Sequence, residues 1–107
     1  MADDAELAAS EEKAEPALSV SAAMGLAKGA LESIVVRLVG EVSELNDKPG
    51  YKAVYFTVKD EKASLPCMMW MSRYQAAGVQ LAVGALVEMT GRFSLYAAKG
   101  RMNFDVF

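Results

Sequence analysis

Apolar and polar residues alternate with a period of two along most of the chain from Ile34 onward. This period places successive side chains on opposite faces of a strand, so one face of each strand is expected to be buried. Along the first strand, Val36, Leu38 and Val42 face one way, while Arg37 faces the other. The same pattern predicts four further strands, at residues 54–59, 65–71, 85–95 and 101–107.

Turn-forming residues separate these strands. A cluster of Asn, Asp, Pro and Gly predicts a loop over residues 44–50, and Asp60-Glu61-Lys62 predicts a tight turn. A second turn is expected at Ala97-Ala98-Lys99-Gly100, between the last two strands. Residues 72–81 have no strand pattern, so we expect a short helix or an irregular crossing there.

Before the first strand, residues 21–32 place apolar side chains at helical spacing. Met24 and Leu31 fall on one side of this helix, and either Ser19 or Ser21 can cap its N-terminus. Two glycines inside it cost up to about 1 kcal/mol each relative to alanine. The helix is therefore expected to depend on packing against another element.

The order of elements is thus a helix, three strands, a short connector and two strands. Five strands with a connector between the third and the fourth predict an all-β fold, a five-stranded OB-fold barrel. An SH3-like barrel is the main alternative, and the helix-like connector favours the OB barrel. We place this domain at residues 17–107. Because the last residues still follow an apolar strand pattern, we expect it to be a piece of a longer chain.

Residues 1–16 differ in charge from the remainder of the chain. They hold six acidic residues and one lysine, a net charge of −5, whereas the remainder has a net charge of +2. We interpret this segment as an acidic flexible tail, because it has no apolar stripe to bury. The mildly basic body suits a polyanionic partner without requiring one.

Catalytic residue types are scarce in this sequence. It has no histidine, and therefore lacks the commonest general base and metal ligand. Its one cysteine, Cys67, follows the buried face of a strand, where a thiol is inert. No P-loop, HExxH or paired-cysteine spacing occurs. We expect no catalytic centre, metal site or cofactor in this chain.

Targeting features are also missing from the sequence. The N-terminus is acidic and is not followed by the apolar run of a secretory signal. No apolar stretch approaches the roughly 20 residues of a membrane span. We expect a cytoplasmic location without membrane attachment.

The outward face of the second and third strands interleaves aromatic and basic residues. OB barrels bind oligonucleotides across these two strands and the adjoining loops. Bases stack on aromatic rings, while cations follow the phosphates of a single strand. The candidate nucleic-acid-binding residues are Arg37, Lys52, Tyr55, Thr57, Lys59, Trp70, Arg92, Tyr96, Lys99 and Arg101.

Two interpretations of this surface remain open. An outward Trp70 can stack on bases, or it can be covered by the N-terminal helix or a partner domain. Met68, Trp70 and Tyr55 would also suit an OB-fold protein-interaction or oligomerisation module with little DNA binding. Lys99 and Arg101 can clamp a phosphate or simply form a solvated hairpin tip.

Several short runs occur in an order and spacing shared with one family. They are Leu18-Ser19-Val20-Ser21, Gly40-Glu41-Val42-Ser43, Tyr55-Phe56-Thr57-Val58-Lys59-Asp60, Cys67-Met68-Met69-Trp70 and the hairpin from Tyr96 to Gly100, together with Gly84 and Gly91. With these runs, residues 17–107 resemble the N-terminal OB domain of the exodeoxyribonuclease VII large subunit. That family usually has Gly-His before its Tyr-Phe pair, where this chain has Lys52-Ala53, so that polar DNA contact is not carried over.

The resemblance implies a function for the parent protein. The family is a cytoplasmic bacterial nuclease, a hydrolase that degrades single-stranded DNA to oligonucleotides, and its large subunit joins several small subunits. The OB domain would bind single-stranded DNA and deliver it to a nuclease domain that is absent from this chain. Whether the parent activity uses Mg²⁺ is left open.

Overall fold

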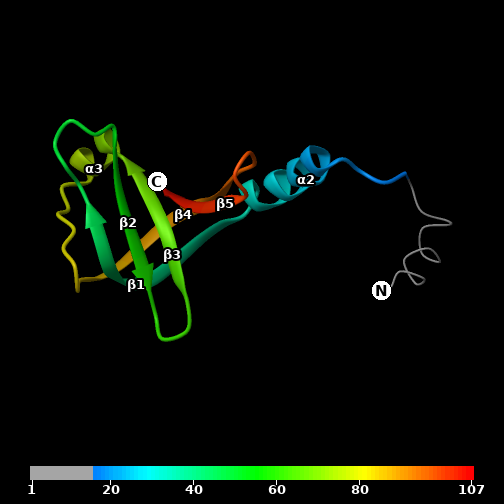
Figure 1. The fold of residues 1–107 in the computed structure, drawn as a ribbon. Helices are drawn as coiled ribbons and strands as arrows, with labels where there is room; N and C mark the ends of the chain where they lie inside the picture. The colour runs from blue at the N-terminus through cyan, green and yellow to red at the C-terminus, as the bar shows by residue number, and fades with distance from the viewer. Residues whose placement is uncertain (1–15) are drawn as a thin grey trace.

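The computed structural model describes residues 16–107, so the predicted acidic tail lies, apart from Pro16, outside the described residues. Within this range the elements are α2 (Val20–Glu32), β1 (Val35–Asn46), β2 (Ala53–Lys59), β3 (Ser64–Trp70), α3 (Met71–Ala77), β4 (Leu86–Tyr96) and β5 (Arg101–Val106). The strands close into a barrel in the order β1-β2-β3-β5-β4, with β4 pairing back onto β1 (Figure 1). Neighbouring strands are antiparallel except β3 and β5, which are parallel. The predicted five-stranded OB barrel, with its helix between β3 and β4, is confirmed.

The interior of the barrel is filled by alternate residues of the strands. Val42, Val54 and Phe104 are fully buried. The ring of Phe104 packs edge-on against that of Phe93, with 5.3 Å between the ring centroids. A Cβ atom at Gly91 would lie 2.7 Å from the Phe104 ring, so glycine is required where β4 crosses it. The inward positions that the alternation predicted therefore form the core.

Two strand boundaries differ from the prediction. β1 continues to Asn46, although a loop was expected from residue 44, because a bulge between Val42 and Glu44 shifts the alternation by one residue. β3 ends at Trp70, and Met71 begins α3 instead of extending the strand. The backbone N–H of Met71 donates to the carbonyl of Lys52 at 2.8 Å, which holds the start of α3 against β2.

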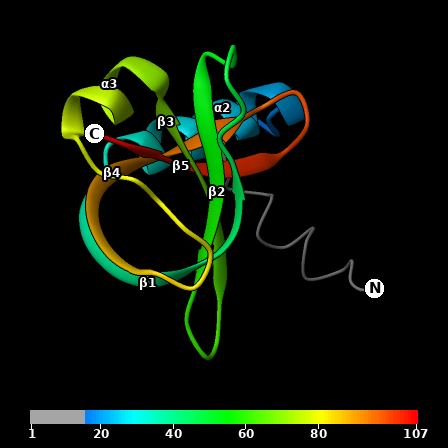
Figure 2. The same cartoon turned by 90° about the vertical axis from the view of Figure 1, so that its left-hand side faces the viewer.

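The N-terminal helix α2 lies on the outside of the barrel and contacts β4 (Figures 1 and 2). The Ser19 hydroxyl caps it by accepting a hydrogen bond from the backbone of Ala22 at 3.1 Å. Near its C-terminus, Lys28 donates to the carbonyl of Leu95 at 3.3 Å, and the Leu95 N–H donates to Glu32 at 3.4 Å. These contacts fix the last turns of α2 beside the β4–β5 hairpin, while no α2 residue is fully buried.

Candidate nucleic-acid interface

The outer face of β2 and β3 presents the residues that alternation directed away from the core. The register places Tyr55 opposite Met68 and Thr57 opposite Pro66. Tyr55 is 49% exposed, and Trp70, at the end of β3, is 52% exposed. Exposed rings on adjacent strands can each stack on a base. The sequence-predicted residues on this face are Tyr55, Thr57, Lys59 and Trp70.

The C-terminal half of β1 widens this face beyond β2. After the bulge, Glu44 pairs with Thr57 and Asn46 pairs with Tyr55. The Thr57 hydroxyl donates a hydrogen bond to Oε1 of Glu44 at 3.3 Å. Neither of these β1 residues was among the predicted site residues, because both were expected to lie in a loop. Leu45, the apolar residue between them, is half-buried in the structure. Its position in the sequence indicates that inward and outward side chains alternate again after the one-residue bulge.

A hollow of about 210 Å³ lies in this face, where β1, β2, β3 and β5 adjoin. The outward side chains that line it are Glu44, Asn46, Tyr55, Thr57, Pro66 and Asn103. Across residues 16–107, neither the Asn46 nor the Asn103 side-chain amide hydrogen-bonds to another residue. The hollow thus combines hydrogen-bonding groups with an exposed aromatic ring.

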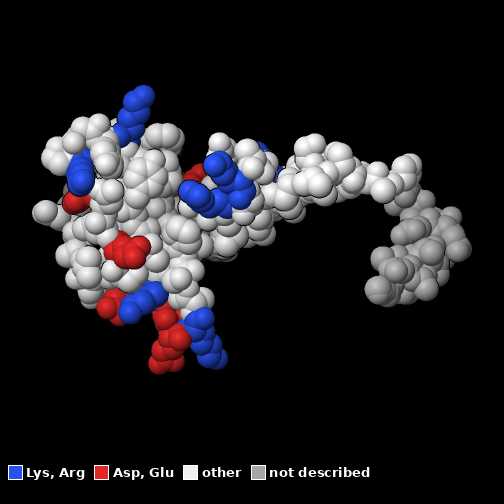
Figure 3. Space-filling model, in the orientation of Figure 1, with Lys and Arg blue, Asp and Glu red and all other residues white. Residues whose placement is uncertain are grey.

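Basic residues lie at the two ends of this face rather than in its middle. Lys52 immediately precedes β2 at one end. At the other end, Lys59 is the last residue of β2. Tyr96, Lys99 and Arg101 lie to the side, at the β4–β5 hairpin beside α2, where Tyr96 pairs with Arg101 (Figure 1). Figure 3 shows Lys and Arg mostly at the periphery, with acidic side chains beside several of them, and an isolated acidic group nearer the middle of the face. A DNA backbone would be attracted most strongly at the periphery.

Two of the sequence-predicted residues lie elsewhere on the barrel. Arg37 belongs to the half of β1 that pairs with β4, and its Nε lies 3.0 Å from Oε2 of Glu88. Arg92 lies on β4, two strands away from β3, with its guanidinium 5.5 Å from the centre of the Phe107 ring. It also pairs across strands with Asp105. The structure therefore does not bring these two cations together with the β2–β3 residues.

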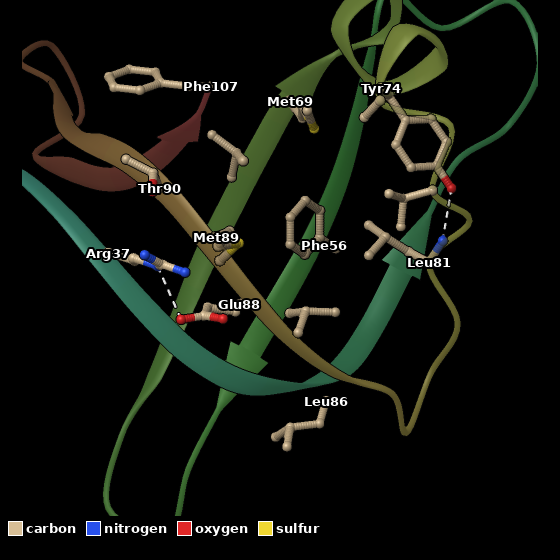
Figure 4. A pocket seen from close by; sticks show the side chains of 14 residues that line it. Arg37, Phe56, Met69, Tyr74, Leu81, Leu86, Glu88, Met89, Thr90 and Phe107 are labelled. Atoms are coloured by element: carbon tan, nitrogen blue, oxygen red, sulfur yellow. Dashed lines mark hydrogen bonds and ion pairs between the residues drawn. The ribbon is translucent and has the colours of Figure 1, made fainter.

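A larger cavity, of about 550 Å³, has a different character (Figure 4). It lies beside α3 and β4 and reaches the inward-facing residues Phe56 and Met89. Three of its polar side chains are already engaged, because the Tyr74 hydroxyl accepts the Leu81 N–H at 2.9 Å and Arg37 is paired with Glu88. A mostly apolar cavity without a free cation does not suit a polyanion. The outer β2–β3 face is therefore the better candidate.

The shifted pKa values of Cys67 and Asp60 both have structural causes. Burial raises the pKa of the Cys67 thiol to about 12, as expected for a core residue without a cationic neighbour. Backbone N–H groups of Lys62 and Ala63 lower the pKa of Asp60 by donating to it in the β2–β3 turn. Within residues 16–107, no three His, Cys, Asp or Glu side chains gather in a way that could hold a metal ion.

The helices among residues 16–107 are not of the membrane-spanning kind. Neither α2 nor α3 has the length and apolar character needed to cross a bilayer.

Comparisons with known proteins agree with this fold. Residues 18–107 match the family model described as "OB-fold nucleic acid binding domain". The chain is 37% identical over 65 residues to the exodeoxyribonuclease 7 large subunit of Streptococcus mutans, which is 61% of this chain and 14% of that protein. It is 38% identical over 79 residues to the same subunit of Campylobacter jejuni subsp. doylei, which is 72% of this chain and 20% of that protein. The chain thus spans a fifth or less of the length of these relatives.

Among solved structures, a replication protein A heterotrimer bound to ssDNA matches with a TM-score of 0.54 and 12% sequence identity. The match covers 67% of this chain and 52% of the other. At this identity, the likeness shows a shared fold.

Proposed function

The chain belongs to the family of OB-fold nucleic acid binding domains, and we propose that it binds single-stranded DNA as part of an exodeoxyribonuclease large subunit. The observation that carries the proposal is the pair of half-exposed rings, Tyr55 and Trp70, on the outer face of β2 and β3. The sequence similarity to exodeoxyribonuclease 7 large subunits supports it. Single-stranded DNA exposes base faces that such rings can stack on, whereas a duplex hides them.

Binding would combine stacking in the middle of the face with phosphate contacts at its edges. Each base stacked on Tyr55 or Trp70 contributes about 1–3 kcal/mol. Lys52 and Lys59 lie at the two ends of β2, and Lys99 and Arg101 lie at the β4–β5 hairpin. Such contacts depend little on base identity and weaken with salt, because phosphate binding releases counterions.

In the parent protein, this domain would hold single-stranded DNA and deliver it to a nuclease domain outside this chain. We propose that the parent is a cytoplasmic enzyme whose large subunit assembles with small subunits. We assign this chain no catalytic residue and no cofactor of its own. The similarity to exodeoxyribonuclease 7 large subunits supports these proposals.

A second candidate function is a protein-interaction module, and α2 favours it. Val20 is 81% exposed and Leu26 is 66% exposed, so this helix offers apolar side chains to a partner. A module of this kind would self-associate or capture another subunit, with little DNA binding. Size-exclusion chromatography with light scattering would detect self-association.

The test of the main proposal is fluorescence anisotropy of a labelled oligo-dT, titrated with the 107-residue chain at two salt concentrations. We expect binding that weakens at the higher salt, with Trp70 emission quenched over the same titration. Trp70 is the chain's one tryptophan, so its emission reports directly on this face. Absence of binding at low salt would contradict the proposal and favour the protein-interaction module.

A further inference from the structure

The middle of the proposed DNA-binding face contains an acidic side chain. Binding to phosphates alone gives no reason for a carboxylate at this position. Glu44 is exposed and pairs with Thr57, beside the Asn46–Tyr55 pair. A carboxylate at this position repels phosphates and favours groups that donate hydrogen bonds. The DNA backbone would therefore pass along the basic edges, and bases would lie over Glu44.

The hollow next to Glu44 offers a matching set of groups. Tyr55 provides a ring at its edge, Pro66 adds an apolar surface, and Asn46 and Asn103 add amides that can donate or accept. Thr57 donates to Oε1 of Glu44, which orients the carboxylate. No residue in the described part of the chain donates to its Oε2. One carboxylate oxygen is thus left available to a ligand.

Bases differ in what they present to a carboxylate. Cytosine, adenine and guanine each have an exocyclic amino group that donates hydrogen bonds, and single strands leave these edges accessible. Thymine and uracil have a carbonyl oxygen where cytosine has its amino group, and two acceptors facing each other repel.

We propose that this hollow binds the edge of a base with an exocyclic amino group, with Glu44 as the acceptor and the base stacked beside Tyr55. The inference rests on the proposed function and adds a preference to it. Single strands rich in amino-bearing bases would be held more tightly than strands rich in thymine or uracil. Glu44 would act as a specificity-determining residue, and Thr57 would position its carboxylate.

The test compares oligo-dC with oligo-dU of equal length, because the two bases share a pyrimidine ring and differ where cytosine has its amino group. We expect the 107-residue chain to bind oligo-dC about three- to tenfold more tightly, as one charge-assisted hydrogen bond at an exposed site would produce. In Glu44→Gln the ratio should fall to about one, because a glutamine amide can accept from cytosine or donate to uracil.

The matched control is Glu61→Gln, which makes the same charge change at the exposed β2–β3 turn. It should keep the preference for oligo-dC, and circular dichroism should confirm that both variants are folded. Equal affinity of the unmodified chain for the two oligonucleotides would overturn the inference, as would a preference that survives in Glu44→Gln. If neither oligonucleotide binds, the proposed function itself fails, and this inference fails with it.

Discussion

The two faces of the β2–β3 pair differ in how far their side chains are exposed to solvent. On the inner face, Val54 and Val58 are packed against the barrel core and are at most 4% exposed. On the outer face, Tyr55 and Trp70 are about half exposed, although they alternate with buried residues along the same strands. The side chains of the inner face pack against other residues of the barrel, whereas the outer rings remain accessible to a ligand. Stability and binding are therefore assigned to alternate residues of the same strands.

This difference leads to predictions that separate the two faces. Substitutions on the inner face should lower the free energy of unfolding, and substitutions on the outer face should lower affinity for single-stranded DNA while leaving stability nearly unchanged.

The largest effect is expected at Phe104, which is fully buried and packs against Phe93. Phe104→Ala should lower the free energy of unfolding by about 4 kcal/mol, because it removes apolar contacts and leaves a cavity. Urea denaturation followed by circular dichroism measures this loss. Phe104→Leu is the control and should retain most of the stability. A loss below about 1 kcal/mol in the alanine variant would contradict the packing described for this core.

The next effect is expected on the outer face. The double variant Tyr55→Ala, Trp70→Ala should bind oligo-dT about 100-fold more weakly, since two stacking surfaces are lost. Its free energy of unfolding should change by less than about 1 kcal/mol. Anisotropy and urea denaturation provide the two readouts. The control variant Val39→Ala, Leu86→Ala changes exposed residues on the β1–β4 side and should bind normally. Unchanged affinity in a folded Tyr55, Trp70 variant would remove these rings from the site.

A smaller effect is expected on the buried side of β3, where Cys67 should make the free energy of unfolding depend on pH. The folded chain raises the pKa of Cys67 from 9.0 to about 12, so it favours the neutral thiol. This contribution is complete below the unfolded pKa and is lost as pH rises from 9.0 toward about 12. Urea denaturation at about pH 8 and about pH 10 should show lower stability at the higher pH, and Cys67→Ala should reduce that difference. An equal decrease in both proteins would assign it to other groups.

The smallest effects should distinguish two exposed cations. Lys59→Ala, at the end of β2, should weaken binding about threefold and reduce the slope of log affinity against log salt by about one. Arg37→Ala should leave both quantities unchanged, because Arg37 lies on the β1–β4 side and is paired with Glu88. A similar loss in both variants would mean that DNA wraps around β1 rather than following the β2–β3 face.

Much of the fold could be predicted from the alternation of residue types. The inward positions of β2, with Val54, Phe56 and Val58, follow directly from a period of two. Prediction failed where the period slipped, because the bulge after Val42 makes Glu44 and Asn46 resemble a loop although they continue β1. A bulge changes local geometry without needing a distinctive residue type.

The candidate site was predicted less completely than the fold. Alternation correctly directs Arg37 outward, but it does not say which neighbouring strand lies beside it. β1 is long enough to pair with β4 along its first half and with β2 along its second half, so outward residues of one strand face different sides of the barrel. For this reason Arg37 is separated from Tyr55, although both are outward and both were predicted to bind nucleic acid.

Where the period of two is unbroken, the sequence by itself determined which side chains are buried and which face solvent, because that choice depends on local alternation and on the free energy of burying apolar surface. It also determined the order of the elements through its turn residues. Only the tertiary structure decided which outward residues meet. Barrel closure places β5 beside β3 in parallel and brings Asn103 to the hollow that Glu44 and Tyr55 line. Such proximity depends on strand register between distant segments, which no local pattern encodes.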